Sequence, residues 1–215
     1  MQEIFTIVIL IMSVVIHEMS HGYTALAFGD QTAKYAGRLT LNPLKHLDPI
    51  GSVIVPLILV LLPGGFVFGW AKPVPYNPNN LRNLKWGTIS VASAGVLANL
   101  FLALIFGLLI RIVLSSSWAV PQSFLIITGM IVFINVLLAI FNLIPVSPLD
   151  GSKIFFSLLP DNYRYIAKFL EQYSIFVILF IIFFLWGYIQ PIMFWLFKVF
   201  SGMSAFEFFN LLQII

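Results

Sequence analysis

The sequence predicts an all-α polytopic membrane protein with about four to six transmembrane helices, and two observations support that prediction. Of the 215 residues, 60% are hydrophobic and only 9% are charged, and the mean hydropathy is +1.03. Soluble globular domains contain far more charged residues, about a quarter of the chain. The apolar residues also form runs long enough to cross a bilayer core of about 30 Å as helices. Because no stretch between these runs is long enough to fold separately, we expect residues 1–215 to form a single integral-membrane domain.

The first two apolar runs are expected to follow different paths through the bilayer. Ile4–Phe28 has 25 residues and would make roughly 37 Å of helix, enough for a complete crossing. After the turn-rich polar stretch Gly29–Pro49, the second run, Ile50–Trp70, is interrupted by Pro63-Gly64-Gly65. We expect this run to form a re-entrant hairpin buried in protein, because a bend exposed to lipid would leave backbone groups unpaired. A full crossing is the alternative.

Three further helical segments are expected in the second half of the chain, at Trp86–Leu114, Phe124–Ile144 and Tyr173–Phe200. Pro145 and Pro148 end the middle one and predict an extended stretch up to Gly151. An amphipathic stretch then leads to the last segment. Gly187 and Pro191 are expected to kink or split that segment, and its many phenylalanines are expected to face lipid.

The basic residues indicate how the chain is oriented. Nine of the eleven Lys and Arg residues lie in the connections that follow the first, second and fourth apolar runs. Loops rich in such residues face the cytoplasm. The net charge of +3 therefore has an origin in membrane topology, and we expect no nucleic-acid partner. The chain has no cysteine, which excludes disulfides and thiolate metal ligands.

A candidate metal motif, His17-Glu18-Met19-Ser20-His21, follows directly on the apolar part of the first run. Histidines at positions i and i+4 project from one face of a helix and can chelate zinc, and the glutamate between them can take a proton from a water molecule on the metal. Ionisable groups inside a membrane helix are costly unless they have a task. The sequence therefore predicts one Zn2+ held by His17 and His21, with Glu18 as the catalytic base.

A catalytic zinc site needs a third protein ligand, and Asp150 is the strongest candidate. It follows the two prolines in a stretch whose backbone requires protein or water nearby, so we expect a hydrated pocket at this depth. The alternative is that Asp150 caps a short helix that begins near Ser152. Asn142 and Asn99 are amides in otherwise apolar helices. Each is a candidate oxyanion or substrate contact, or else bonds a neighbouring helix.

His46 and Asp48 are also candidates for the metal, since histidine is the commonest zinc ligand. We favour a structural role for both. In that interpretation the Asn42-Pro43 and Asp48-Pro49 pairs fix turns, and His46 bonds a backbone carbonyl.

Together these motifs make the chain resemble the site-2 protease family of zinc intramembrane metalloproteases. The resemblance rests on five stretches, which are His17–His21, Asn42–Gly51, Gly69–Pro75, Ala94–Asn99 and Asn142–Gly151. It implies that His17, His21 and Asp150 bind zinc. It also implies that Glu18 is catalytic and that the substrates are transmembrane segments of other proteins, cut within the bilayer. The chain is similar to compact bacterial members without PDZ or CBS domains, which implies the bacterial cytoplasmic membrane. Val96 stands where the family usually has proline, which puts the expected bend of that helix in doubt.

Two other functions stay open on the sequence. One is the trimming of peripheral or lipidated peptides at the cytoplasmic surface, and the other is a non-enzymatic metal-binding scaffold or transporter, which would not require Glu18. A helical substrate hides its peptide bonds, so cleavage within the membrane requires local unwinding. Arg38–Leu41 alternates as a strand does, and Lys72–Tyr76 is held extended by its prolines. Either could pair with an unwound substrate, or both could be ordinary interfacial loops.

Overall fold

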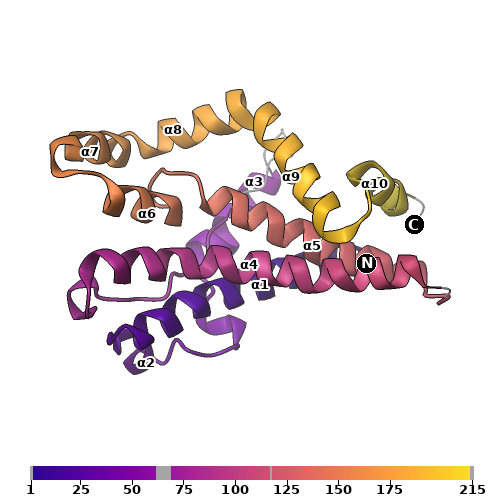
Figure 1. Ribbon diagram of the computed structural model, residues 1–215, viewed down its shortest axis with the longest axis horizontal. Coiled ribbons are helices and arrows are strands. Elements are labelled where there is room, and N and C mark those ends of the chain that lie inside the picture. Colours follow the sequence, from indigo (N-terminus) through magenta and orange to yellow (C-terminus); the bar gives the residue numbers. More distant parts are fainter. Residues whose placement is uncertain (1, 62–68, 117, 214–215) are drawn as a thin grey trace.

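The computed structural model describes residues 2–61, 69–116 and 118–213, and every regular element in these ranges is helical (Figure 1). Four helical segments of the described residues are long and apolar enough to cross a membrane: α1 (Gln2–Ala27), α4 (Leu84–Ser115), α5 (Gln122–Asn142), and the continuous run of α8 (Ser174–Phe180), a π-helical turn (Ile181–Leu185) and α9 (Trp186–Ser201). The shorter helices are α2 (Thr32–Tyr35), α3 (Val55–Leu61), α6 (Asp150–Leu158), α7 (Arg164–Gln172) and α10 (Ala205–Gln213). The predicted all-α polytopic architecture is confirmed.

The ends of the long helices follow local sequence signals. α4 begins after Asn83, whose side chain accepts a hydrogen bond from the Trp86 N–H at 3.0 Å, as N-cap residues do. It then continues for 32 residues as one uninterrupted α-helix through Val96, where a proline would have removed a backbone hydrogen bond. α9 ends at Gly202, whose φ of +76° is left-handed and favours glycine.

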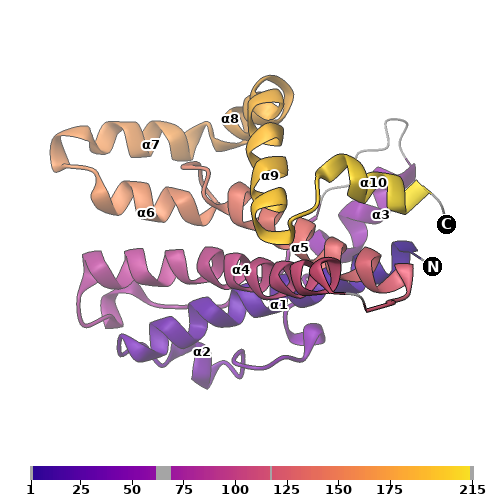
Figure 2. The same ribbon diagram turned by 45° about the vertical axis from the view of Figure 1, so that its right-hand side comes forward.

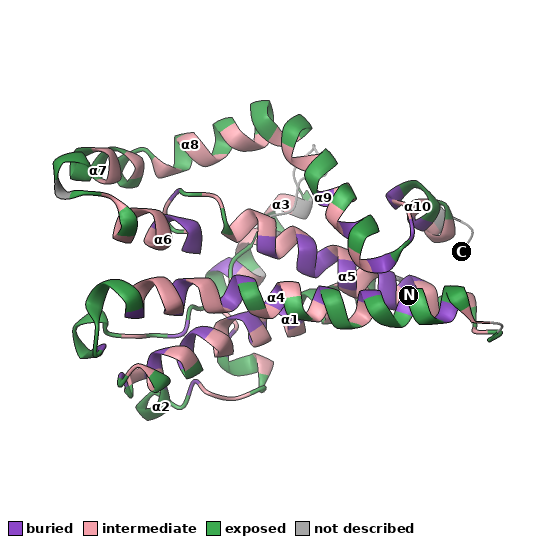
Figure 3. Ribbon diagram, viewed as in Figure 1, coloured by how far each residue is buried: buried purple, intermediate pink, exposed green. Residues whose placement is uncertain are grey.

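The central bundle consists of α1, α4 and α5, with α4 packed against both of the others (Figures 1 and 2). Glycine allows close approach: a Cβ at Gly107 would lie 2.7 Å from the backbone of Phe200, so α9 packs directly on α4. Near the two termini, Phe197 of α9 and Phe208 of α10 fill a core against Val132 of α5. Buried residues gather where these helices face one another, whereas the described residues of α7 and α8 include none (Figure 3).

The last span divides into two parts with different surroundings. α8 has no buried residue, in agreement with the expectation that this segment faces lipid. One face of α9 contributes Met193, Phe197 and Ser201 to the interior, so the same expectation holds only for the other, exposed face of this helix. The predicted irregularity is present, but the π-helical turn lies before Gly187, and Pro191 is accommodated inside α9.

Hydrogen bonds join the two ends of the second apolar run. Its described part begins with a π-helical stretch of 6 residues (Pro49–Ile54), followed by the 7 residues of α3. The Trp70 N–H donates to the Gly51 carbonyl at 3.1 Å, and the Ser52 hydroxyl donates to the Trp70 carbonyl at 2.8 Å. The start and the end of the run therefore lie side by side, as a re-entrant hairpin requires. Its predicted turn, Pro63-Gly64-Gly65, lies outside the described residues.

The connection between α5 and α6 differs from the prediction. The two prolines do end α5, but residues 143–149 form consecutive turns instead of an extended stretch. Hydrogen bonds donated by the backbone N–H groups of Val146 and Leu149 close these turns, which satisfies polar groups that an extended chain would leave unpaired. The turns return α6 to the end of α5. A Cβ at Gly151 would lie only 2.3 Å from the Leu143 carbonyl oxygen, so this contact requires glycine.

Candidate metal centre

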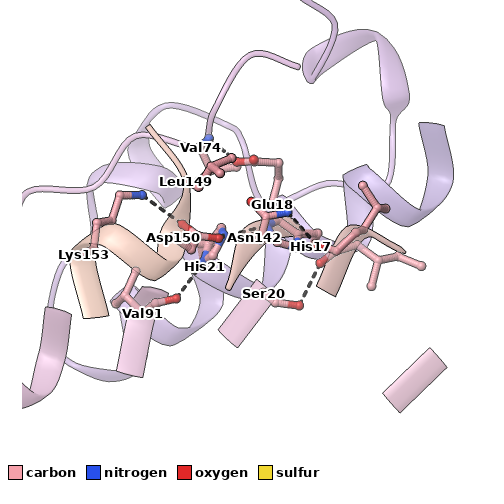
Figure 4. Close-up of polar contacts among 12 residues, drawn as sticks. His17, Glu18, Ser20, His21, Val74, Val91, Asn142, Leu149, Asp150 and Lys153 are labelled. Atoms are coloured by element: carbon pink, nitrogen blue, oxygen red, sulfur yellow. Dashed lines mark hydrogen bonds and ion pairs between the residues drawn. The ribbon is translucent and has the colours of Figure 1, made fainter. Parts of the chain in front are cut away.

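Three of the predicted site residues meet inside the protein. His17 and His21 lie one turn apart on α1, and Asp150 is the first residue of α6 (Figure 4). The Asp150 Oδ2 atom lies 3.1 Å from Nε2 of His17 and 2.9 Å from Nε2 of His21. All three side chains are buried. The fold thus joins a helical motif to a carboxylate 133 positions later in the chain than His17.

This donor set fits a zinc ion. One ligand atom from each of the three residues lies within 4.8 Å of the others, and no other such group of His, Cys, Asp or Glu occurs in the described part of the chain. Bonds of about 2.0–2.1 Å in tetrahedral geometry place two ligand atoms about 3.3 Å apart. The observed separations of 3.1 and 2.9 Å are close to that value. Catalytic zinc sites use such a set of three and keep a fourth position open.

The two histidine rings are held by α4. The His21 Nδ1 atom lies 2.7 Å from the Val91 carbonyl oxygen and donates to it, which leaves Nε2 to face Asp150. A Cβ at Gly95 would lie 2.5 Å from the His17 ring, so α4 can pass the ring this closely only with glycine there. Glycine in the Ala94–Asn99 motif therefore has a packing reason.

Asp150 is oriented by Lys153, one turn later on α6. The Lys153 Nζ atom donates to Oδ1 at 3.0 Å, which leaves Oδ2 for the imidazoles. Burial alone would raise the pKa of Asp150, but the contacts of its carboxylate with the two histidine rings and the charge of Lys153 hold it well below its usual range. The capping alternative is wrong, because α6 starts at Asp150 and its N-cap, Leu149, makes no side-chain cap bond. The sequence analysis missed Lys153, although its i+3 spacing from Asp150 was a usable signal.

Glu18 is held by the connection before α4, residues 70–77, which we call the strap. The Val74 N–H donates to the Glu18 Oε2 atom at 2.7 Å (Figure 4). The Val74 side chain is buried against α1, where a Cβ at Gly22 would lie 3.0 Å from it. The strap has no regular secondary structure, as expected for a segment with two closely spaced prolines. Sequence reasoning did not find the contact with Glu18, because no local pattern connects residues 56 positions apart.

Asp30 fixes the far end of the strap. Its carboxylate accepts hydrogen bonds from the Asn77 N–H at 2.7 Å, the Asn80 side-chain amide at 2.9 Å and the Thr32 N–H at 3.1 Å. Burial alone would raise the pKa of Asp30, but the hydrogen bonds from Thr32, Asn80 and Asn77 outweigh that effect and hold it below its usual value. The turn after α1 is thereby tied to the strap.

Asp30→Ala should lower the free energy of unfolding by about 1–3 kcal/mol at neutral pH, because the donors from Thr32, Asn77 and Asn80 lose a buried, charged acceptor. Folding lowers the pKa of Asp30, so its contribution is complete above the unfolded value of about 3.9 and is lost as the pH falls through the folded value. The melting temperatures of the wild type and the variant in detergent should therefore differ at neutral pH and converge at acidic pH. Glu171→Ala, which removes an exposed carboxylate of α7, is the control and should melt as the wild type does. A gap that persists unchanged into the acidic range would contradict the expectation.

The two predicted asparagines occupy different environments. Asn142, at the end of α5, is partly exposed beside the histidines, and its Nδ2 atom donates to the Leu138 carbonyl at 3.0 Å (Figure 4). Asn99 on α4 is fully buried, with 0% exposure, and neither amide atom has a partner among the described residues. A side chain without exposed surface cannot touch a substrate in this conformation. Of the two, only Asn142 has exposed surface.

His46 and Asp48 lie outside the group of three. The His46 side chain is only 1% exposed, and its Nε2 atom donates to the Thr40 carbonyl at 2.9 Å. The Asp48 carboxylate accepts from the N–H groups of Ile50 and Gly51 at 3.0 and 2.7 Å, which caps the helical start of the second run. These are contacts of the structural kind expected for both residues.

The helices and the site define a class of protein, a polytopic membrane protein with a His-Glu-x-x-His helix and a distant aspartate in the arrangement of a metallopeptidase. The family model described as Peptidase family M50 matches residues 110–185, which include α5, Asp150 and α6. "Putative zinc metalloprotease YwhC" of Bacillus subtilis (strain 168) is 38% identical over 185 residues, which cover 82% of this chain and 80% of that protein. The chain belongs to Peptidase family M50, and the resemblance to site-2 proteases is confirmed.

Two further relatives agree. "Putative zinc metalloprotease Rip2" of Mycolicibacterium smegmatis is 32% identical over 198 residues, covering 91% of this chain and 73% of the relative. The protein of the same name from Mycobacterium tuberculosis (strain ATCC 25618 / H37Rv) is 28% identical over 196 residues, covering 90% and 73%. No solved structure gives a significant match.

Proposed function

We propose that the protein is a zinc-dependent endopeptidase that hydrolyses peptide bonds within or near the transmembrane segments of other membrane proteins. The observation that carries the proposal is the Glu18 carboxylate, fixed beside the buried histidine and aspartate group. A scaffold or a transporter needs metal ligands but has no use for a fixed carboxylate at the position of a general base. The relatives named as zinc metalloproteases support one Zn2+ per chain, held by His17, His21 and Asp150.

The side chains of the site divide the chemistry among them. A zinc ion bound by the three ligands would supply Lewis-acid activation of water and of the scissile carbonyl. Glu18 Oε2 already accepts the Val74 N–H, so Oε1 is the atom left to take the proton of the attacking water and to return it to the leaving amine. Asn142 can donate its amide to the oxygen that becomes negative, as an oxyanion donor does. Lys153 keeps Asp150 turned toward the histidines.

The substrate must present an unwound backbone, because a transmembrane helix pairs all of its own peptide groups. The strap is poorly suited to bind such a backbone, since four of its groups are engaged, namely Lys72 N–H, Lys72 C=O, Pro73 C=O and Val74 N–H. Arg38–Leu41 has fewer engaged groups, namely the Arg38 N–H and the Thr40 C=O. Within it, Leu39 lies against α1, where a Cβ at Gly22 would be 2.6 Å from the Leu39 side chain, one residue beyond His21. This segment is our candidate for pairing with the substrate by strand addition.

We further propose that the active site lies toward the cytoplasmic side of a bacterial cytoplasmic membrane. The connections before and after the second run carry six basic residues and sit beside the C-terminal half of α1, and basic loops stay on the cytoplasmic side. The partners on this proposal are the lipid bilayer and single-span protein substrates. Residues 1–215 act as one protease domain.

Two substrates with the same scissile sequence test the proposal. In the first, the sequence is embedded in a single transmembrane helix, and in the second it belongs to a soluble peptide anchored to the membrane by a lipid. The purified protein in liposomes should cut the first and spare the second, and a zinc chelator should abolish the cut until zinc is restored. Mass spectrometry maps the cut. If only the lipidated peptide is cut, the alternative of a peptidase that trims peripheral or lipidated peptides is favoured. If neither substrate is cut in a way that the chelator prevents, the protease assignment is overturned.

A further inference from the structure

Arg38 is a buried cation without an ionic partner. Its side chain is only 7% exposed, and no ion pair to it forms among the residues that the structure describes. Its Nε atom has no hydrogen-bond partner in the same part of the chain. An unpaired guanidinium is unfavourable in a protein interior, so its presence requires a compensating interaction.

The compensating interaction is with the backbone of the strap. The Arg38 Nη2 atom donates to the Lys72 carbonyl at 2.7 Å and to the Pro73 carbonyl at 3.3 Å. Pro73 and Pro75 have no N–H, so this part of the strap cannot be held by a regular hydrogen-bond ladder. The single N–H between them belongs to Val74, and Glu18 accepts it. Arg38 therefore binds the carbonyls of Lys72 and Pro73, and the next residue, Val74, donates its N–H to Glu18.

We propose that Arg38 is a positioning residue for Glu18. The guanidinium fixes the strap through the Lys72 and Pro73 carbonyls, the fixed strap presents the Val74 N–H, and that N–H holds the Glu18 carboxylate through Oε2. The catalytic part of this inference rests on the proposed function, whereas the structural link from Arg38 to Glu18 does not. Both bonds come from Nη2, which lies one bond further from the backbone than the ammonium nitrogen of a lysine would, so lysine is not expected to reach both carbonyls.

The chain offers a matched control for this contact. Arg111 of α4 also donates to backbone carbonyls, from Nε to Phe200 at 2.9 Å and from Nη2 to Lys198 at 3.4 Å. These carbonyls end α9, so Arg111 has a helix-capping role far along α4 from Gly95 and the histidines. Arg111→Met removes the same chemistry without touching the strap.

Amide hydrogen exchange tests the link directly. Between Lys72 and Pro75 only Lys72 and Val74 carry amide hydrogens, so a peptide of this region reports on few sites. In the wild type the Val74 amide should exchange slowly. Arg38→Met should speed its exchange roughly 10- to 100-fold, the range for loss of a hydrogen bond to a charged group. Glu18→Ala should release the same amide, and Arg111→Met should leave it protected.

Kinetics in liposomes tests the consequence for catalysis. Arg38→Met should lower kcat roughly 10- to 100-fold, the scale of a small misplacement of a catalytic group, while KM and bound zinc stay within about twofold. Arg38→Lys keeps the charge on a shorter side chain and should show the same pattern, and it serves as the test variant if Arg38→Met does not fold. Arg111→Met should keep the wild-type kcat.

The outcomes separate this inference from the proposed function. Unchanged Val74 exchange in a folded Arg38 variant would overturn the inference, and so would zinc loss in step with lost activity. A wild type that cuts no substrate would count against the proposed function, and the exchange data would still decide whether Arg38 positions Glu18.

Discussion

Glu18→Gln is expected to abolish peptide cleavage and to leave the metal in place. Glutamine has nearly the same shape and its carbonyl oxygen can still accept the Val74 N–H, so the strap should stay where it is. An amide cannot take a proton from water, and loss of a general base lowers rates by about 10²- to 10⁴-fold. Because His17, His21 and Asp150 are untouched, bound zinc per chain should equal that of the wild type.

Two measurements on one preparation check this expectation. Metal analysis of the purified variant gives the zinc content, and the model substrate with the embedded scissile bond gives the rate. Glu171→Gln, an equivalent change on the exposed surface of α7, is the control and should retain full activity. A Glu18→Gln variant that cuts at the wild-type rate would exclude Glu18 as the base, and the non-enzymatic interpretation would then be favoured.

Asp150→Ala is expected to lose bound zinc. The substitution leaves two imidazoles, and catalytic zinc sites need three protein ligands. Replacing even an outer partner of a metal ligand lowers affinity by about 10- to 100-fold, so loss of a ligand should exceed that range. Competition with a chromophoric chelator measures the affinity. His46→Ala removes a buried histidine that bonds Thr40 and should keep its zinc, although it should melt at a lower temperature.

Lys153 supplies a needed control for that experiment. In Asp150→Ala the ammonium of Lys153 loses its carboxylate partner and stays near the histidines, where its charge would also repel a cation. The double variant Asp150→Ala, Lys153→Met removes that repulsion. If Asp150 is a ligand, the double variant stays weak in zinc binding. Recovery of wild-type affinity in the double variant, or loss of zinc in His46→Ala instead, would overturn the ligand assignment.

Features that follow from the periodicity or hydropathy of a short segment were predictable from the sequence. The helical period places His17 and His21 on one face, and the hydropathy of the long runs requires helices because lipid offers no partners to the backbone. The meeting of Asp150 with the two histidines was predictable for a different reason: a catalytic zinc site needs one more protein donor, and Asp150 was the strongest candidate. The Pro-Gly-Gly interruption and the basic loops likewise predicted that the two ends of the second run meet. The hydrogen bond between Trp70 and Gly51 shows that they do.

Features that depend on contacts between distant segments were not predictable. Prolines 145 and 148 correctly end α5, but whether the chain then extends or turns depends on what α6 packs against. The inward face of α9 depends on α10, a helix that the sequence analysis did not anticipate. In both cases the structure depends on packing against a distant segment, which the local sequence pattern does not reveal.

The sequence by itself determined the helical membrane architecture and the residue types of the metal group, because hydropathy, helical period and ligand chemistry are properties of short segments. Only the tertiary structure decided what surrounds that group: Gly95 against the His17 ring, Lys153 on the spare oxygen of Asp150, and the strap across Glu18. The physical reason is that hydrogen bonds and van der Waals contacts act over a few ångströms. Which groups come within that range is set by how the helices pack.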